Sequence, residues 1–88
     1  MVHFTLYSRS YCHLCEDMHQ QLLVFAADYR FTVEVIDIDE QTEYLSQYDE
    51  LVPVLVGKKV DPANQAPTQL CHYFLDRGLV KAFLDEAK

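Results

Sequence analysis

The sequence contains no apolar run of the roughly 18 residues that a membrane-spanning helix needs. Its first residues, Met1–Tyr7, also lack the basic start and the long apolar stretch of a signal peptide. We therefore expect a cytoplasmic protein that does not associate with membranes. Basic side chains are scarce as well, with 7 lysines and arginines against 14 acidic residues and a formal net charge of −7. This balance disfavours nucleic acid as a partner, because phosphates attract a basic surface, and it favours solubility.

Internal repeats and low-complexity tracts are also absent, and 88 residues are the length of one domain, so we treat 1–88 as a single domain. Half of the residues are hydrophobic, which is enough for a modest core. The chain has only three cysteines, and two of them, Cys12 and Cys15, are separated by two residues. In the cytosol such a Cys-x-x-Cys pair is more often redox-active or metal-binding than a structural disulfide.

Hydrophobic periodicity predicts alternating strands and helices. Residues 2–7 alternate as a half-buried strand, and a helical period follows from Cys12 to Tyr29. The run Phe31–Ile38 is apolar on both faces, which predicts an interior strand parallel to the first. The further predicted elements are a helix at Glu40–Tyr48 capped by Asp39, a strand at Leu51–Val56 ended by Gly57, a strand at Gln69–Tyr73 and a helix at Asp76–Ala87. A single helix from Thr68 onward is the alternative, and it would enclose Gly78 at a cost of about 1 kcal/mol relative to alanine.

The Cys-x-x-Cys pair lies where the first predicted helix begins, after a strand and a short loop. Cys15 falls on the apolar arc of that helix, whereas Cys12 at its start can stay partly exposed. Unpaired backbone N–H groups and the positive end of the helix dipole favour a thiolate at this position. Arg9 could add a cation, while Glu16 and Asp17 oppose the negative sulfur. These features predict that Cys12 attacks a disulfide and that Cys15 resolves the mixed disulfide.

Two other functions stay open from the residues alone. Cys12, Cys15 and His19 share one side of the helix and could supply three of the four ligands that zinc takes. His3 or Cys71 could complete the set from a neighbouring strand, and an iron–sulfur cluster shared between two chains is a related alternative. The chain could also be an interaction module without activity, although the presence of both cysteines disfavours it. Outside a metal site, we expect Cys71 to be a small buried hydrophobe.

The segment Tyr7–Cys15, YSRSYCHLC, resembles the Tyr-Ser-Lys-x-x-Cys-x-x-Cys opening of glutaredoxins. The Val52-Pro53 dipeptide resembles the Val-Pro of that fold, whose proline is cis, and the likeness covers the whole chain. The Tyr-Cys-His-Leu-Cys-Glu string resembles small bacterial glutaredoxin-like proteins of uncharacterised function. The resemblance implies a thioredoxin-like three-layer α/β/α fold with a four-stranded mixed sheet and the order β-α-β-α-β-β-α. Thioredoxin proper fits less well, because the chain has no tryptophan and lacks the extra N-terminal β-α unit.

This resemblance implies a thiol–disulfide oxidoreductase of cell redox homeostasis, acting on protein or glutathione disulfides. Besides the two cysteines, the predicted substrate-binding residues are Arg9, Tyr11, His13, Val52 and Pro53. We expect a monomer with no metal and no tightly bound cofactor, and glutathione is a candidate reductant. However, Tyr73–Asp76 lacks both glycines of the Gly-Gly-x-Asp segment with which glutaredoxins approach glutathione. The dipeptide His13-Leu14 is expected to set the reduction potential.

Overall fold

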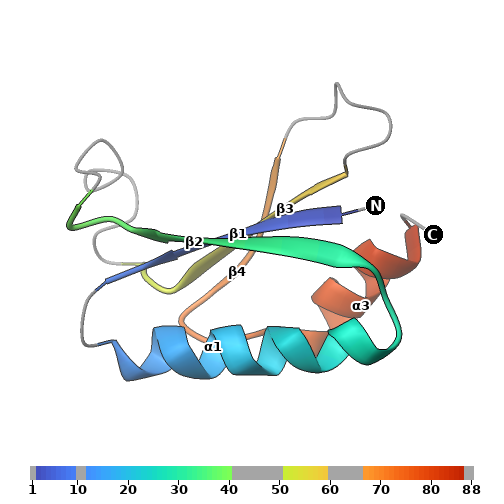
Figure 1. Ribbon diagram of the computed structural model, residues 1–88, viewed down its shortest axis with the longest axis horizontal. Coiled ribbons are helices and arrows are strands. Elements are labelled where there is room, and N and C mark those ends of the chain that lie inside the picture. The colour runs from blue at the N-terminus through green and yellow to red at the C-terminus, as the bar shows by residue number, and fades with distance from the viewer. Residues whose placement is uncertain (1, 10–11, 41–50, 60–66, 87–88) are drawn as a thin grey trace.

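The computed structural model describes residues 2–9, 12–40, 51–59 and 67–86 (Figure 1). Its elements are β1 (Val2–Ser8), α1 (His13–Val24), the 3-10 helix η1 (Phe25–Ala27), β2 (Phe31–Asp37), β3 (Val54–Lys59), β4 (Thr68–His72) and α3 (Arg77–Glu86). The predicted helix at Glu40–Tyr48 lies outside the described residues, apart from Glu40 itself. None of the described helices combines the length and the apolar character that crossing a bilayer would require.

The four strands form one mixed sheet in the order β2-β1-β3-β4. β1 pairs in parallel with β2, from Val2 opposite Phe31 to Ser8 opposite Asp37. The other neighbouring pairs, β1 with β3 and β3 with β4, are antiparallel. The predicted four-stranded mixed sheet is therefore confirmed. Because β1 and β2 run in parallel, the residues that follow them lie close together at the C-terminal ends of these two strands.

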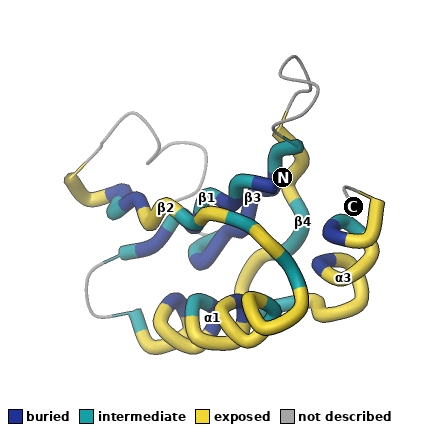
Figure 2. The backbone as a smooth tube through the Cα atoms, turned by 45° about the vertical axis from the view of Figure 1, so that its right-hand side comes forward, coloured by how far each residue is buried: buried dark blue, intermediate teal, exposed yellow. Residues whose placement is uncertain are grey.

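Both described helices, α1 and α3, cover the same face of the sheet (Figure 1). β1 alternates between its two sides, so Val2, Phe4 and Leu6 point toward these helices and are at most 1% exposed. The buried residues that complete this core are Met18, Leu22, Leu55, Val80 and Leu84. A separate buried cluster consists of Ile38, Val54 and Val56. The outward side of α1 is exposed to solvent (Figure 2).

β2 is an edge strand, not the interior strand predicted from Phe31–Ile38. Among the described strands it pairs only with β1, and Val35 within it is 48% exposed. Some of its apolar residues are instead buried or half-buried near the two ends of the strand. The ring of Phe31 packs edge-on against Phe4 at 5.2 Å between centroids, and Ile38 is buried beyond the end of the strand. Apolar content alone therefore could not distinguish an edge strand with buried ends from a central strand.

β3 begins at Val54, three residues later than predicted, and the Val52-Pro53 bond before it is cis, as the family resemblance implied. Proline has no N–H for the ladder, so pairing with β1 starts only at Val54, opposite Tyr7.

The prediction that Gly57 ends this strand is wrong, because β3 continues through it to Lys59. A Cβ at Gly57 would lie 2.8 Å from Cε2 of Phe83 on α3. The glycine is required by this close packing of the strand and the helix.

The last part of the chain forms a strand followed by a helix, so the alternative of one helix from Thr68 is excluded. Asp76 caps α3, because its carboxylate accepts a hydrogen bond from the Leu79 N–H at 3.1 Å. The helix predicted from Cys12 to Tyr29 is shorter in the structure, since α1 ends at Val24 and η1 follows.

Candidate active site

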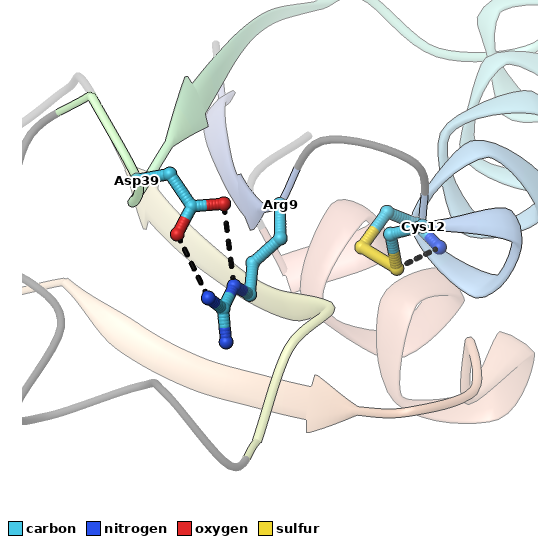
Figure 3. The surroundings of a disulfide bond; sticks show 4 residues. Arg9, Cys12 and Asp39 are labelled. Carbon is cyan, nitrogen blue, oxygen red and sulfur yellow. Dashed lines mark hydrogen bonds and ion pairs between the residues drawn. A yellow bond between two sulfur atoms is a disulfide. The ribbon is translucent and has the colours of Figure 1, made fainter.

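Cys12 and Cys15 form a disulfide at the N-terminus of α1, with their Cα atoms 5.2 Å apart. Cys12 is the N-cap residue, and its sulfur accepts a hydrogen bond from the Cys15 N–H at 3.1 Å (Figure 3). Cys12 is half-buried, whereas Cys15 is only 5% exposed. The predicted asymmetry of the pair is therefore present in the structure. The backbone N–H that contacts the Cys12 sulfur would also stabilise a thiolate there.

A cavity of about 420 Å³ lies beside the disulfide, between α1 and the β1–β2 edge of the sheet. Its lining residues are Leu6, Ser8, Arg9, Cys12, His13, Cys15, Glu16, His19 and Val35. The structure thus brings four predicted site residues together, namely both cysteines, Arg9 and His13. Tyr11, another predicted site residue, lies outside the described residues.

Arg9 follows β1 directly and forms an ion pair with Asp39, which follows β2. Its Nη2 donates to Oδ1 at 2.9 Å and its Nε donates to Oδ2 at 3.3 Å (Figure 3). The carboxylate offsets much of the positive charge that Arg9 would otherwise offer to a Cys12 thiolate. Sequence reasoning missed Asp39 at the site. The parallel pairing of the two strands was the available signal, because it brings both positions to one edge of the sheet.

Val52 and Pro53, which were predicted to shape the substrate groove, do not line the cavity. Pro53 is buried, and its carbonyl oxygen accepts a hydrogen bond from the Tyr73 N–H at 2.9 Å. Val52 is half-buried and packs with the cluster of Ile38, Val54 and Val56. The cis-proline segment is therefore tied to the β4–α3 connection.

Tyr73 has a φ of +63°, in the left-handed region that favours glycine. It begins Tyr73–Asp76, where the resemblance to glutaredoxins places two glycines. Two aromatic side chains stand there on the surface, with Tyr73 40% exposed and Phe74 70% exposed. Leu14, between the two cysteines, falls on the same apolar arc of the predicted helix as Cys15, so the helical period predicts its burial, yet it is 39% exposed in the structure. Leu14, Tyr73 and Phe74 also line one small pocket of about 80 Å³.

Cys71 is half-buried and packs against the main core, as a small hydrophobe would. Burial raises the pKa of its thiol, and the Asp76 backbone N–H, which hydrogen-bonds the sulfur, partly opposes this effect. Within the described part of the chain, no three His, Cys, Asp or Glu side chains are placed to hold a metal ion. His3, one proposed fourth ligand, instead contacts Thr32 at 2.6 Å. The zinc alternative therefore has no assembled site there.

The sheet and helices define a thioredoxin-like fold, and solved structures support this class. Mitochondrial thioredoxin 3 from Saccharomyces cerevisiae, in its oxidised form, is 16% identical over 97% of this chain and 77% of that one, with a TM-score of 0.63. At that identity the likeness concerns the fold alone.

The chain belongs to the glutaredoxin-like domain family (DUF836), whose model matches residues 3–85. Protein Ne2328 from Nitrosomonas europaea, solved by NMR, is 36% identical over 94% of this chain and 91% of that one, with a TM-score of 0.79. Protein XcR50 from X. campestris is 29% identical over 97% and 99% of the two chains, with a TM-score of 0.58. No curated protein matches the chain by sequence.

Proposed function

We propose that this glutaredoxin-like domain is a dithiol–disulfide oxidoreductase. The observation that carries the proposal is the Cys12–Cys15 disulfide, with one half-buried sulfur that accepts an N–H at a helix start and one buried sulfur behind it. In the reduced protein, the Cys12 thiolate attacks a substrate disulfide, forms a mixed disulfide and releases one substrate thiolate. Cys15 then attacks the Cys12 sulfur, which releases the second substrate thiol and forms the Cys12–Cys15 disulfide. Two electrons pass from the protein to the substrate.

We further propose that polypeptide disulfides are better substrates than glutathione disulfide. Tyr73 occupies a left-handed position where a glycine would let a ligand approach the backbone, and its N–H is already bonded to Pro53. The exposed side chains of Leu14, Tyr73 and Phe74 offer apolar contacts to residues that flank a protein disulfide.

Trapping the reaction halfway tests the dithiol mechanism. A Cys15→Ser variant should accumulate a covalent mixed disulfide with a disulfide-bonded model protein, seen as a mass increase that a reductant reverses. Both variants are made in a Cys71→Ala background, and the matched Cys12→Ser variant should accumulate none, because its only remaining thiol, Cys15, is buried. If both variants trap substrate equally, or if neither does, the assigned roles are wrong.

The reductant is tested by two coupled assays run side by side, one with glutathione and glutathione reductase and one with thioredoxin reductase. We expect little turnover in the first assay. Rapid glutathione-dependent turnover would show that glutathione reaches the Cys12–Cys15 disulfide despite Tyr73, which would remove the ground for the proposed preference while leaving the dithiol mechanism intact.

A further inference from the structure

The proposed reaction requires Cys15 to lose a proton at a buried position. The thiolate is the attacking form, and a thiol in apolar surroundings holds its proton more tightly than a free one. Cys15 is 5% exposed, and its own N–H is directed to the Cys12 sulfur. Leu6 and Val35, from β1 and β2, add apolar walls to the adjoining cavity. A proton acceptor beside Cys15 would therefore accelerate the second step.

The cavity beside the disulfide contains one well-placed acceptor, His19. Its position is one helical turn after Cys15, about 40° away around the helix axis, whereas His13 is about 160° away. An imidazole is the side chain that exchanges protons near neutral pH, and a carboxylate such as that of Glu16 is ordinarily too weak a base for a thiol proton. Arg9, also in the lining, is permanently protonated and paired with Asp39.

The surroundings of His19 suit a transient positive charge. Glu16 lies three residues earlier on α1 and lines the same cavity, so it places a negative charge near an imidazolium. From the sheet, β1 contributes Leu6 and Ser8 and β2 contributes Val35, none of which is charged. Within the described residues, no hydrogen bond to the His19 side chain is present, so the ring is available.

We propose that His19 accepts the Cys15 proton during resolution of the mixed disulfide, an inference that rests on the proposed dithiol function. The Cys15 thiol transfers its proton to the imidazole, and the resulting thiolate attacks the Cys12 sulfur. The bond between Cys12 and the substrate sulfur breaks as the Cys12–Cys15 bond forms. The imidazolium then returns the proton to the departing substrate thiolate or to water. The substrate disulfide is reduced and the protein dithiol is oxidised.

Ellman's reagent, 5,5′-dithiobis(2-nitrobenzoate), separates the two steps in a single turnover. In a Cys71→Ala background, the reduced protein should release one coloured thiolate when Cys12 attacks and a second when Cys15 resolves. The released thiolate is a weak base and needs no proton, so the second phase reports on Cys15 deprotonation. A free thiol is only a few per cent ionised at pH 7, so loss of an effective base should be easily measured.

We expect His19→Gln to slow the second phase at least tenfold at pH 7, with the first phase changed less than twofold. General-base catalysis typically contributes about 10²- to 10⁴-fold. The second-phase rate should depend more steeply on pH in the variant than in the unsubstituted background, because without a base only the Cys15 thiolate already present can attack. Added imidazole should accelerate the second phase of His19→Ala, which leaves space in the cavity. His3→Gln, a matched change at the remote end of β1, should alter neither phase.

Equal second-phase rates and pH profiles with and without His19 would overturn the inference while leaving the dithiol mechanism standing. A Cys15→Ser variant, which should release only one equivalent, identifies the second phase. If the unsubstituted background also releases only one equivalent, the dithiol function itself is rejected, and the role of His19 with it. A purely structural role for His19 would change both phases together and would show no rescue by imidazole.

Discussion

At the scale of single residues, the two glycines of the chain predict opposite responses to the same substitution. A Cβ on Gly57 would lie 2.8 Å from Phe83 Cε2 and 3.0 Å from Leu70 Cδ1. The Phe83 ring cannot move freely, since it packs against Phe4 at 6.1 Å between centroids. We expect Gly57→Ala to lower the free energy of unfolding by about 1–3 kcal/mol, the usual cost of overpacking. Urea denaturation monitored by circular dichroism measures it.

Gly78→Ala is the matched control for this prediction. Gly78 lies within α3, and the nearest atom to an added Cβ is Asp76 Oδ1 at an ordinary 3.5 Å. Alanine should stabilise the helix by up to about 1 kcal/mol through its higher helix propensity. Effects of the same sign at the two positions would contradict the packing assigned to Gly57.

Cys71 gives a pH-dependent prediction. Burial raises the pKa of its thiol, so the folded state favours the neutral form. Its contribution to stability is fully present below the ordinary thiol pKa and is lost as the pH rises through the higher folded value. In the oxidised protein, where Cys12 and Cys15 are joined, iodoacetamide should react with Cys71 at a higher midpoint pH in the folded chain than in urea. Coincident pH profiles would refute the assigned burial.

The local sequence pattern predicted the position and the unequal burial of the two cysteines well, because a helix start and its apolar arc are encoded by consecutive residues. It could not predict the contact of Arg9 with Asp39, which depends on the parallel alignment of β1 with β2. Nor could it predict the left-handed backbone of Tyr73, since a tyrosine gives no sign of a positive φ. That conformation accompanies a hydrogen bond to Pro53, 20 positions away in the sequence.

At the scale of elements, the cap of α3 carries the next prediction. The Asp76 carboxylate accepts the Leu79 N–H at 3.1 Å, and the Asp76 carbonyl accepts the Val80 N–H at 3.0 Å. Asp76→Ala removes only the side-chain bond and should cost about 0.5–2 kcal/mol of unfolding free energy. Asp76→Asn should retain most of the stability, because asparagine is an equally good N-cap residue. Asp17→Ala, an exposed aspartate within α1, provides the control for loss of a carboxylate.

The elements themselves were predicted well where their signals are local. Strand alternation in β1 and the Asp76 cap of α3 both follow from neighbouring residues. The place of β2 at the edge and the passage of β3 through Gly57 depend instead on partners far away in the sequence. Apolar residues in β2 are compatible with either a central or an edge strand, and a glycine in β3 can either end the strand or allow close packing. Only the packed structure distinguishes these alternatives.

At the scale of the whole molecule, the net charge of −7 should govern which disulfides react fastest. Glu16 lines the cavity beside the disulfide, and the positive charge of the nearby Arg9 is paired with Asp39. The charge around the disulfide is therefore negative, like the net charge of the protein. We expect the reduced protein to react faster with cystamine, which carries two positive charges, than with the dianion 3,3′-dithiodipropionate. The ratio of the rates should fall as salt is added, because the screening length shrinks from about 30 Å at 0.01 M to about 3 Å at 1 M.

The two disulfides also differ in intrinsic reactivity. The rate constant of each is therefore compared with its own value at other salt concentrations, and neutral hydroxyethyl disulfide shows how salt changes the rate when the substrate has no charge. Two substitutions of equal charge then distinguish local from overall attraction. Glu16→Gln, at the cavity, should reduce the preference for cystamine more than Glu86→Gln, at the end of α3, where the carboxylate pairs with Lys59 at 3.2 Å. Equal effects of both would assign the preference to total charge, and a ratio that salt leaves unchanged would show that electrostatic attraction does not select the substrate.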